Sequence, residues 1–269
     1  MISKRMKKQI WSWLAGIFAL IAVMACVTTT TQTTAPPPRP QNESVLRVGV
    51  STNAPPIIFK QDGKITGLEA DFAREFATYL GKSLHFVELK WDNQITALLN
   101  NQTDIIMSGM TKTALREARV SFSTPYFRSG QMALIRMKDA ASFRTGFYSI
   151  KDDVAIGAVK DTTGEFFVLE QFGGNKTVSF SKSNDGVEAL IKGEIDIFIH
   201  DAPIIMYLAS ENETRRVTPV YSLFTEEYLA WAMRKDDTKL QNAANDFLQE
   251  IHKNGRLKQL IQRWIPLTK

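Results

Sequence analysis

The 269-residue sequence contains few of the side chains that hold metals, with one cysteine and three histidines. No zinc-type cluster of cysteine and histidine and no phosphate-binding glycine loop occurs in it. The formal net charge is +5, but four basic residues lie in the first 25 positions, which contain no acid. Without them, 29 basic residues stand against 28 acidic residues, and no basic stripe indicates nucleic-acid binding. The sequence therefore predicts no metal site, no cofactor and no nucleic-acid partner.

The single cysteine, Cys26, follows a segment that is typical of export. A basic start precedes the apolar run Ile10 to Ala25, which is short for a membrane span and fits a signal peptide over residues 1–25. Val23 to Cys26 resembles the bacterial lipobox, where a signal peptidase cuts before a lipidated cysteine, and we predict lipidation of Cys26. The alternative is an uncleaved signal anchor in which Cys26 is incidental. Residues 26–44 are rich in Thr and Pro and predict a disordered tether.

The stretch Thr103 to Arg116 predicts a buried strand, an exit of small residues and the start of a helix. Ile105 to Met107 is a short apolar run, typical of a strand covered on both faces. Ser108, Gly109 and Thr111 then leave backbone N–H groups and a hydroxyl uncovered where the strand ends. Arg116 would lie in the first helical turn, a poor electrostatic place for a cation, and its planar guanidinium suits a bidentate carboxylate. The alternative is an ordinary surface arginine.

An internal repeat predicts two similar α/β lobes. The segments ALLNNQTDIIMSG from Ala97 and ALIKGEIDIFIHD from Ala189 align without gaps, so that Gly109 matches Asp201. Ligands of open α/β sheets bind outside the carboxyl ends of the strands. An arginine in one lobe, Arg116, and an aspartate in the other, Asp201, could therefore grip the two charges of a zwitterion. Asp201 can also cap the helix that follows it, and the two roles are compatible.

Two further segments are expected to join the lobes. Gln131 to Arg136 and Tyr228 to Met233 are strand-like and predict two crossings between the lobes, as in a hinged pair that closes over a ligand. The clearest helix of the chain is predicted over Gly67 to Gly81, because its large apolar side chains recur at a spacing of four.

Two motifs leave alternatives open. Thr162 and Glu165 predict a capping box, and with Thr163 they place hydroxyl and N–H groups at the positive end of a helix, where an anion can bind. These residues can equally do no more than cap the helix. Trp91 stands at a strand–helix junction, a place where a tryptophan more often belongs to the core than to a ligand platform.

Six segments together resemble one known family. They are LRVGV, PPIIFKQDGKITGLEADFA, GMTKTALREARVSFSTPY, KDTTGE, GEIDIFIHDAP and NGRLKQLIQRWI. Over Leu46 to Pro266 the chain resembles the polar-amino-acid family of bacterial periplasmic solute-binding proteins, the receptors of amino-acid ABC importers. The resemblance implies an α/β type II periplasmic-binding-protein fold with a ligand cleft between two lobes. Lobe 1 is expected over residues 45–127 and 228–269, and lobe 2 over residues 128–227.

The resemblance also implies binding roles for positions that match the family's motifs. The carboxylate grip of the family corresponds to Gly109, Thr111 and Arg116. Contacts from the second lobe to the same carboxylate correspond to Thr162 and Thr163.

At the other end of the ligand, Asp201 corresponds to the acid that takes the α-amino group. His200 beside it matches the His–Asp pair of glutamine-binding relatives. Trp91 falls where relatives place an apolar or aromatic side chain against the ligand, and this shifts its expected role from core to ligand contact.

Three positions depart from the family pattern. Ala54 replaces an aromatic that stacks on the ligand, and Ser51 replaces an aspartate that helps to hold the amino group or side chain. Asp161 replaces a glycine and adds a negative charge near the carboxylate seat. The amino-acid grip is therefore expected to persist, while the specificity for the ligand's side chain is expected to differ.

The predicted function is an extracytoplasmic, lipid-anchored binding protein, monomeric, in the periplasm or at the cell surface. It would capture an amino acid by lobe closure and deliver it to an ABC permease without catalysis. One alternative is a sensory or accessory lipoprotein. The other is a periplasmic dehydratase on the same fold, for which Asp201, Asp161 and His200 are the only acid–base candidates.

Overall fold

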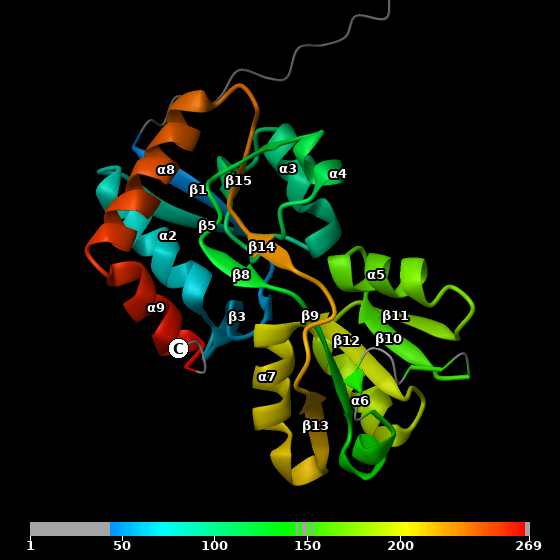
Figure 1. Ribbon diagram of the computed structural model, residues 1–269. Helices are drawn as coiled ribbons and strands as arrows, with labels where there is room; N and C mark the ends of the chain where they lie inside the picture. Colours follow the sequence, from blue (N-terminus) through cyan, green and yellow to red (C-terminus); the bar gives the residue numbers. More distant parts are fainter. Residues whose placement is uncertain (1–43, 144, 147–149, 152, 267–269) are drawn as a thin grey trace, which may run out of the picture. The chain divides into compact units, whose positions relative to one another are not determined.

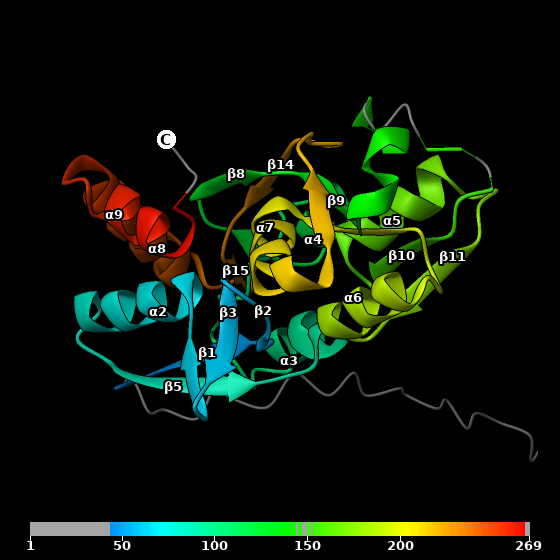
Figure 2. The same cartoon turned by 90° about the horizontal axis from the view of Figure 1, so that it is seen from below.

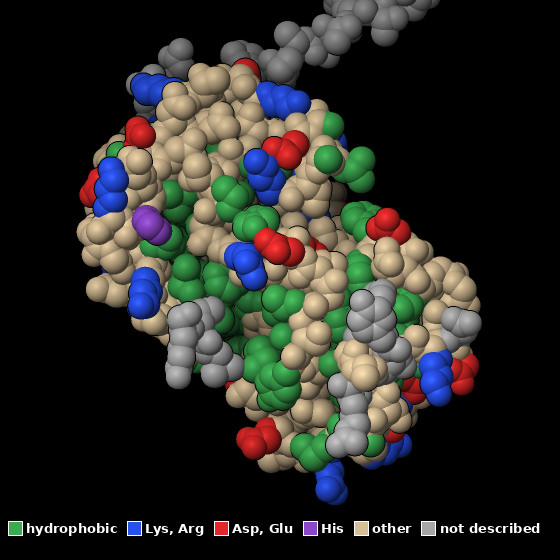
Figure 3. Space-filling model, in the orientation of Figure 1, with side chains coloured by type: hydrophobic (Ala, Val, Ile, Leu, Met, Phe, Trp, Pro, Cys, Tyr) green, Lys and Arg blue, Asp and Glu red, His purple; other side chains and the backbone are tan. Residues whose placement is uncertain are grey.

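The structure is a computed structural model that describes residues 44–143, 145–146, 150–151 and 153–266 (Figure 1). The predicted signal peptide, Cys26 and the tether up to residue 43 lie outside the described residues. Within the described ranges, no helix is both long and apolar enough to cross a membrane. On the face shown in Figure 3, basic and acidic side chains are interspersed rather than gathered into a block of one sign.

The first sheet contains five strands and is built mainly from the first part of the chain. Three strands are parallel, and the fourth runs antiparallel to both of its neighbours. In spatial order the strands are β5 (Ser83–Glu88), β1 (Val45–Val50), β6 (Ile105–Ile106), β15 (Ala232–Met233) and β7 (Ser121–Phe122). The accompanying helices are α2 (Leu68–Tyr79), α3 (Gln94–Leu99), α4 (Ala114–Glu117), α8 (Thr238–Lys253) and α9 (Arg256–Trp264). A small antiparallel sheet is formed by β2 (Asn53–Ala54), β3 (Ile58–Gln61) and β4 (Lys64–Thr66).

The second sheet repeats this pattern of strand directions. Three parallel strands are again followed by a fourth that runs antiparallel to both of its neighbours. In spatial order the strands are β11 (Thr177–Phe180), β10 (Ile156–Val159), β12 (Ile197–Asp201), β9 (Gln131–Arg136) and β13 (Val217–Val220). The accompanying helices are α5 (Thr163–Gln171), α6 (Ser183–Lys192) and α7 (Ala202–Glu211). The prediction of two similar α/β lobes is thereby confirmed.

Two short strands connect the sheets. β8 (Phe127–Ser129) pairs antiparallel with β14 (Glu227–Leu229), and Figure 1 shows them side by side between the two sheets. The prediction that Gln131–Arg136 crosses between the lobes was wrong. This segment is β9, an internal strand of the second sheet, because its side chains from Gln131 to Ile135 are buried among neighbouring elements. The second predicted crossing divides into β14, which crosses, and β15, which joins the first sheet.

The internal repeat of the sequence is also a repeat of interactions. Before β6, Asp104 accepts the backbone N–H of Arg47 at 2.9 Å and pairs with its guanidinium at 2.7 Å. Before β12, Asp196 accepts the backbone N–H of Ala155 at 2.9 Å and pairs with Arg136 at 2.7 Å. Burial opposes ionisation of both carboxyls, yet these hydrogen bonds and charges lower the pKa of both. Each lobe thus uses a matching aspartate to tie its central strands together.

The predicted helix Gly67 to Gly81 forms as α2 and carries the core of the first lobe. Leu68, Phe72 and Phe76 are fully buried, and the two phenylalanine rings pack on Trp231 at centroid distances of 5.7 and 5.6 Å. Helices α2, α8 and α9 pack together along this side (Figure 2). The helix begins after Gly67, whose φ of 116° and close approach to the Ile57 carbonyl leave no room for a side chain.

A fully buried carboxyl, Glu69, joins this core to the end of the first sheet. It accepts the backbone N–H of Gly109 at 2.8 Å, the hydroxyl of Tyr126 at 2.7 Å and the indole N–H of Trp231 at 2.9 Å. Burial raises the pKa of Glu69 from 4.5 to about 7, against the opposing effect of these three donors. Glu69 therefore changes charge near neutral pH.

This shift predicts a pH-dependent stability that Glu69→Gln removes. Between pH 4.5 and 7 the folded protein retains a proton that the unfolded chain has lost. The stability from this group is therefore fully present below pH 4.5 and is lost as the pH rises through 7. Between pH values below 4.5 and above 7, the contribution of Glu69 to the free energy of unfolding falls by about 3 kcal/mol. Urea unfolding at pH 5, 6, 7 and 8 measures it, with the exposed Glu250→Gln as the control. Equal pH dependence in wild type and Glu69→Gln would contradict the prediction.

Candidate functional site

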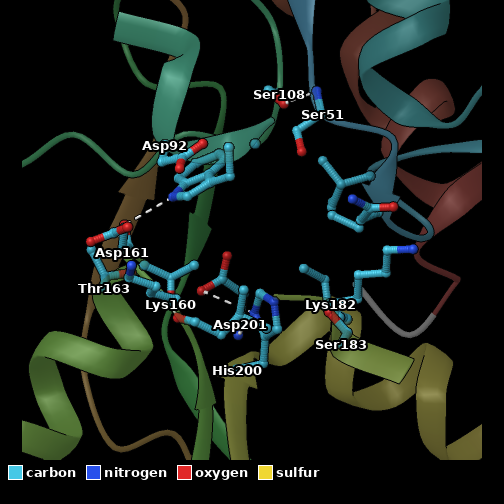
Figure 4. Close-up of a pocket in the computed structure, with 18 of the residues that line it drawn as sticks. Ser51, Asp92, Ser108, Lys160, Asp161, Thr163, Lys182, Ser183, His200 and Asp201 are labelled. Atoms are coloured by element: carbon cyan, nitrogen blue, oxygen red, sulfur yellow. Dashed lines mark hydrogen bonds and ion pairs between the residues drawn. The ribbon is translucent and has the colours of Figure 1, made fainter. Parts of the chain in front are cut away.

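A cavity of about 290 Å³ lies where the carboxyl ends of strands from both sheets meet (Figure 4). All nine residues predicted to bind ligand line it. They are Ser51, Trp91, Gly109, Thr111 and Arg116 from the part of the chain that builds the first sheet, and Thr162, Thr163, His200 and Asp201 from the second. The volume is at the lower end of the range of small-molecule sites.

Arg116 is a buried cation at this cavity, with 9% of its surface exposed. It lies in α4, which Thr113 caps by accepting the Arg116 backbone N–H at 3.3 Å. Its Nη1 donates to the carbonyl of Thr111 at 2.8 Å, and its Cζ lies 5.3 Å from the ring centre of Trp91. Burial lowers the pKa of Arg116 below its ordinary value. The negative charges of Asp201 and Glu227 oppose this shift without reversing it. Within the described ranges, Arg116 forms no ion pair with a carboxylate.

The groups expected to be uncovered beside Arg116 already have acceptors, so that part of the expectation was wrong. The N–H of Gly109 donates to Glu69, as described above, and the hydroxyl of Thr111 donates to Glu227 at 2.9 Å. Both acceptors come from parts of the chain remote in sequence, and the local pattern Ser108 to Thr111 contains no sign of them. The arginine therefore lies beside donors that are already satisfied.

The predicted capping box of α5 forms on the Thr162 side, while Glu165 binds a different N–H from the one expected. Thr162 accepts the backbone N–H of Glu165 at 3.3 Å and donates to the carbonyl of Val159 at 2.6 Å, so its hydroxyl serves the helix end. The Glu165 carboxylate reaches back to the N–H of Asp161 at 2.7 Å rather than to that of Thr162. Thr163, the first residue of α5, donates its hydroxyl to Glu227 at 2.9 Å.

Trp91 spans the cavity edge between the two parts of the site. Its indole N–H donates to the carbonyl of Asp161 at 2.8 Å (Figure 4). Asp161 has a φ of 60°, a conformation that glycine adopts most easily and aspartate tolerates. This backbone conformation gives a physical reason for the glycine that the family resemblance implies at this position.

Asp201 stands at the start of α7, but its side chain does not cap that helix. Its Oδ1 accepts the side-chain N–H of Gln131 at 2.6 Å, and its own N–H donates to Nδ1 of His200 at 2.7 Å. Asp201 is thus the N-cap residue of α7, as predicted, but its carboxylate makes no capping hydrogen bond, and Oδ2 has no described donor. Among the residues that the structure describes, no cluster of three or more potential metal ligands occurs.

Two residues that the sequence did not single out, Glu227 and Gln131, connect the predicted ones. The Glu227 carboxylate, on the crossing strand β14, accepts from the hydroxyls of Thr111 and Thr163 at 2.9 Å each and from Gln131 Nε2 at 3.0 Å. The same amide nitrogen donates to Asp201. The sequence signal for Glu227 was a pair of glutamates, Glu226 and Glu227, directly before the predicted crossing strand Tyr228 to Met233.

The sequence matches a known protein family over most of its length. Residues 46–267 match the family described as bacterial extracellular solute-binding proteins, family 3. The L-cystine-binding protein TcyJ of Escherichia coli (strain K12) is 28% identical over 229 residues, 83% of this chain and 84% of TcyJ. The arginine-binding extracellular protein ArtP of Bacillus subtilis (strain 168) is 27% identical over 254 residues, 91% of this chain and 96% of ArtP.

Solved structures share the fold. The ancestral amino acid-binding protein AncCDT-1, a precursor of cyclohexadienyl dehydratase, is 32% identical with a TM-score of 0.76, covering 82% of this chain and 95% of that chain. An ancestral arginine-binding protein bound to arginine is 28% identical with a TM-score of 0.76, covering 82% of this chain and 98% of that chain. These matches confirm the predicted type II periplasmic-binding-protein fold.

Glu227→Gln is expected to destabilise the unliganded protein. An amide keeps one oxygen acceptor and presents an NH₂ group to the donors of Thr111, Thr163 and Gln131, which leaves buried donors unpaired. The expected loss is about 1–3 kcal/mol in the free energy of unfolding, a fall of several degrees in Tm.

The neighbouring Glu226→Gln is the matched control, because Glu226 is 57% exposed and its partners among the described residues are the exposed Arg128 and Tyr228. Its expected effect on stability is within about 0.5 kcal/mol. Thermal unfolding of both variants checks the prediction, and equal Tm values would contradict it.

Proposed function

This chain belongs to the bacterial extracellular solute-binding proteins of family 3, and we propose that it holds an amino acid between Arg116 and Asp201. The observation that carries the proposal is the buried guanidinium of Arg116, which lines the cavity without a described carboxylate partner. The α-carboxylate of an amino acid supplies the missing anion, in the bidentate geometry that guanidinium groups favour. The α-ammonium group supplies a donor for the open Oδ2 of Asp201.

The protein is an amino-acid-binding component of an ABC transporter. Its relatives include the ABC transporter glutamine-binding protein GlnH of Bacillus subtilis (strain 168), which is 28% identical. The function is binding and release rather than catalysis, since the relatives are named as binding proteins. AncCDT-1 is itself an ancestral amino acid-binding protein, although it precedes a dehydratase.

The other predicted residues are assigned to parts of the ligand by their positions around the cavity. Trp91 packs against the apolar part of the ligand, as its place beside Arg116 favours. Thr162 and Thr163 bring the positive end of α5 towards the carboxylate. Gly109 contributes a close backbone surface, because a Cβ there would lie 2.8 Å from Ile57.

We assign Ser51 and His200, which also line the cavity, to the ligand's side chain. Closure is assigned to a hinge at β8 and β14, with lobe 1 over residues 45–127 and 228–269 and lobe 2 over residues 128–227. The antiparallel pairing of the two crossing strands supports these boundaries.

Removal of the guanidinium tests the grip. Arg116→Ala is expected to weaken amino-acid binding by about 2–5 kcal/mol, thirtyfold or more in Kd, because the ligand carboxylate loses its buried partner. The amino acid is identified first by thermal unfolding against a panel of L-amino acids, where a ligand at about 100 times its Kd stabilises by about 2.7 kcal/mol.

Isothermal titration calorimetry with that amino acid then gives the Kd values. The control is Arg119→Ala, three positions further along the chain and exposed, which should bind as wild type does. Unchanged affinity of Arg116→Ala would overturn its assignment, and the absence of any stabilising amino acid would overturn the proposed site as a whole.

The chain is further assigned as a monomeric lipoprotein, anchored through Cys26 in the periplasm or at the cell surface. The apolar run before Cys26, the lipobox-like residues Val23 to Cys26 and the Thr/Pro-rich segment after them support this assignment. The tether would let the binding domain reach its permease while the lipid holds it at the membrane.

Cys26→Ser is expected to abolish labelling by radioactive palmitate and to prevent lipoprotein processing. Because Cys26 is the only cysteine, the label reports on this residue alone. Labelling of cells that express each form, followed by immunoprecipitation, measures the effect. Absence of label and unchanged length in the wild type would instead support the uncleaved signal anchor.

A further inference from the structure

One part of the cavity is lined by polar side chains from both sheets. Figure 4 shows Ser51 and Ser108 on one side, with His200, Lys182 and Ser183 on the other. Under the proposed function, this region receives the end of the ligand's side chain. Its hydrogen-bonding groups therefore decide which amino acid fits.

Ser108 can act only as a donor towards the cavity. Its oxygen accepts the backbone N–H of Ser51 at 2.8 Å and Nε2 of Gln94 at 3.1 Å. A hydroxyl oxygen has two acceptor sites, and both are used. Its own hydrogen has no acceptor among the described residues, and Ser108 is 97% buried, since 3% of its surface is exposed. An oxygen acceptor on a ligand would satisfy it.

Ser51 adds a second hydroxyl directed into the same space. Its backbone N–H is held by Ser108, and its side chain points into the cavity (Figure 4). The side chain makes no hydrogen bond to a described residue, although Ser51 is buried with 6% of its surface exposed. The two serines together form a pair of adjacent hydroxyls that a carbonyl or carboxylate oxygen can reach.

The opposite wall also presents donors. Nδ1 of His200 accepts the N–H of Asp201, so in the neutral ring Nε2 carries the hydrogen. Lys182, exposed at the rim of the cavity, adds a positive charge.

Among the described lining residues of the cavity, three are acidic. Asp92 and Asp161 stand at the edge formed by Trp91, and Asp201 is assigned to the α-ammonium group (Figure 4). The Asp201 carboxylate lies beside His200, with Oδ1 3.9 Å from Nδ1, but this oxygen is already held by Gln131. A cationic side chain placed there could use only the free oxygen of Ser51, because both acceptor sites of Ser108 are occupied, and it would face the charge of Lys182.

We propose that this subsite, formed by Ser51 and Ser108, takes an amino-acid side chain that ends in an oxygen acceptor, a carboxylate or an amide carbonyl, and rejects cationic side chains. The inference rests on the proposed function and names the substrate class of that site. It separates this chain from relatives named for arginine, such as ArtP.

Calorimetry with five L-amino acids of similar length tests the proposal. Glutamine and glutamate carry the acceptor, lysine and arginine carry a cation, and norleucine carries neither. Glutamine or glutamate should bind at least about tenfold more tightly than lysine, arginine and norleucine, which corresponds to the loss of one hydrogen bond to a buried donor. Tighter binding of lysine or arginine would overturn the inference while leaving the proposed function intact. If neither norleucine nor any of the twenty common amino acids binds to the folded protein, the inference and the proposed function are both overturned.

Substitutions at Ser51 show whether the serine pair causes the preference for side chains that end in an oxygen acceptor. Ser51→Ala retains the backbone bond to Ser108 and should weaken glutamine or glutamate binding about tenfold without changing norleucine binding. Ser51→Asp should reverse the preference towards lysine and arginine. Ser210→Ala and Ser210→Asp, at an exposed position of α7, are the matched controls and should leave all affinities unchanged. Equal losses for glutamine and norleucine in Ser51→Ala would assign Ser51 a structural role and overturn the proposal.

Discussion

The buried guanidinium of Arg116 is the charge around which the cavity is arranged. Its described hydrogen bond goes to the neutral carbonyl of Thr111, and the face of Trp91 lies against it. Two carboxylates, Asp201 and Glu227, stabilise its charge from a distance without pairing with it. A buried charge with incomplete compensation is costly, so the arrangement favours the entry of an anion. An amino acid's carboxylate fits this requirement under the proposed function.

The same polar groups that surround Arg116 also connect the two sheets. Glu227 on the crossing strand β14 accepts from Thr111 on one side and from Thr163 on the other. Trp91 donates to Asp161 across the cavity edge. Because these bonds join residues of both lobes, a ligand that alters the charges at Arg116 and Asp201 also acts on the contacts that hold the lobes together. Under the proposed function, these hydrogen bonds couple ligand binding to lobe closure.

The sequence predicted the two lobes and the residues that surround the cavity, because strand ends and helix starts follow from local patterns and from the repeat. It failed at Gln131–Arg136, since a strand buried inside a sheet and a strand crossing between lobes have the same apolar pattern. It also missed the acceptors of Gly109 and Thr111. Glu69 and Glu227 are 40 and 116 positions away from the groups they bind, and no local pattern predicts such contacts.

Under the proposed function, the cavity separates two kinds of recognition. At one end, the charges of Arg116 and Asp201 are held by α4, β12 and the network of Gln131 and Glu227, so a change there affects binding and fold together. At the other end, the side chain of Ser51 makes no hydrogen bond to a described residue. A substitution at this position alters what the ligand meets without removing a structural bond. An amino-acid grip of fixed geometry can thus be combined with side-chain specificities that differ among relatives named for cystine, arginine and glutamine.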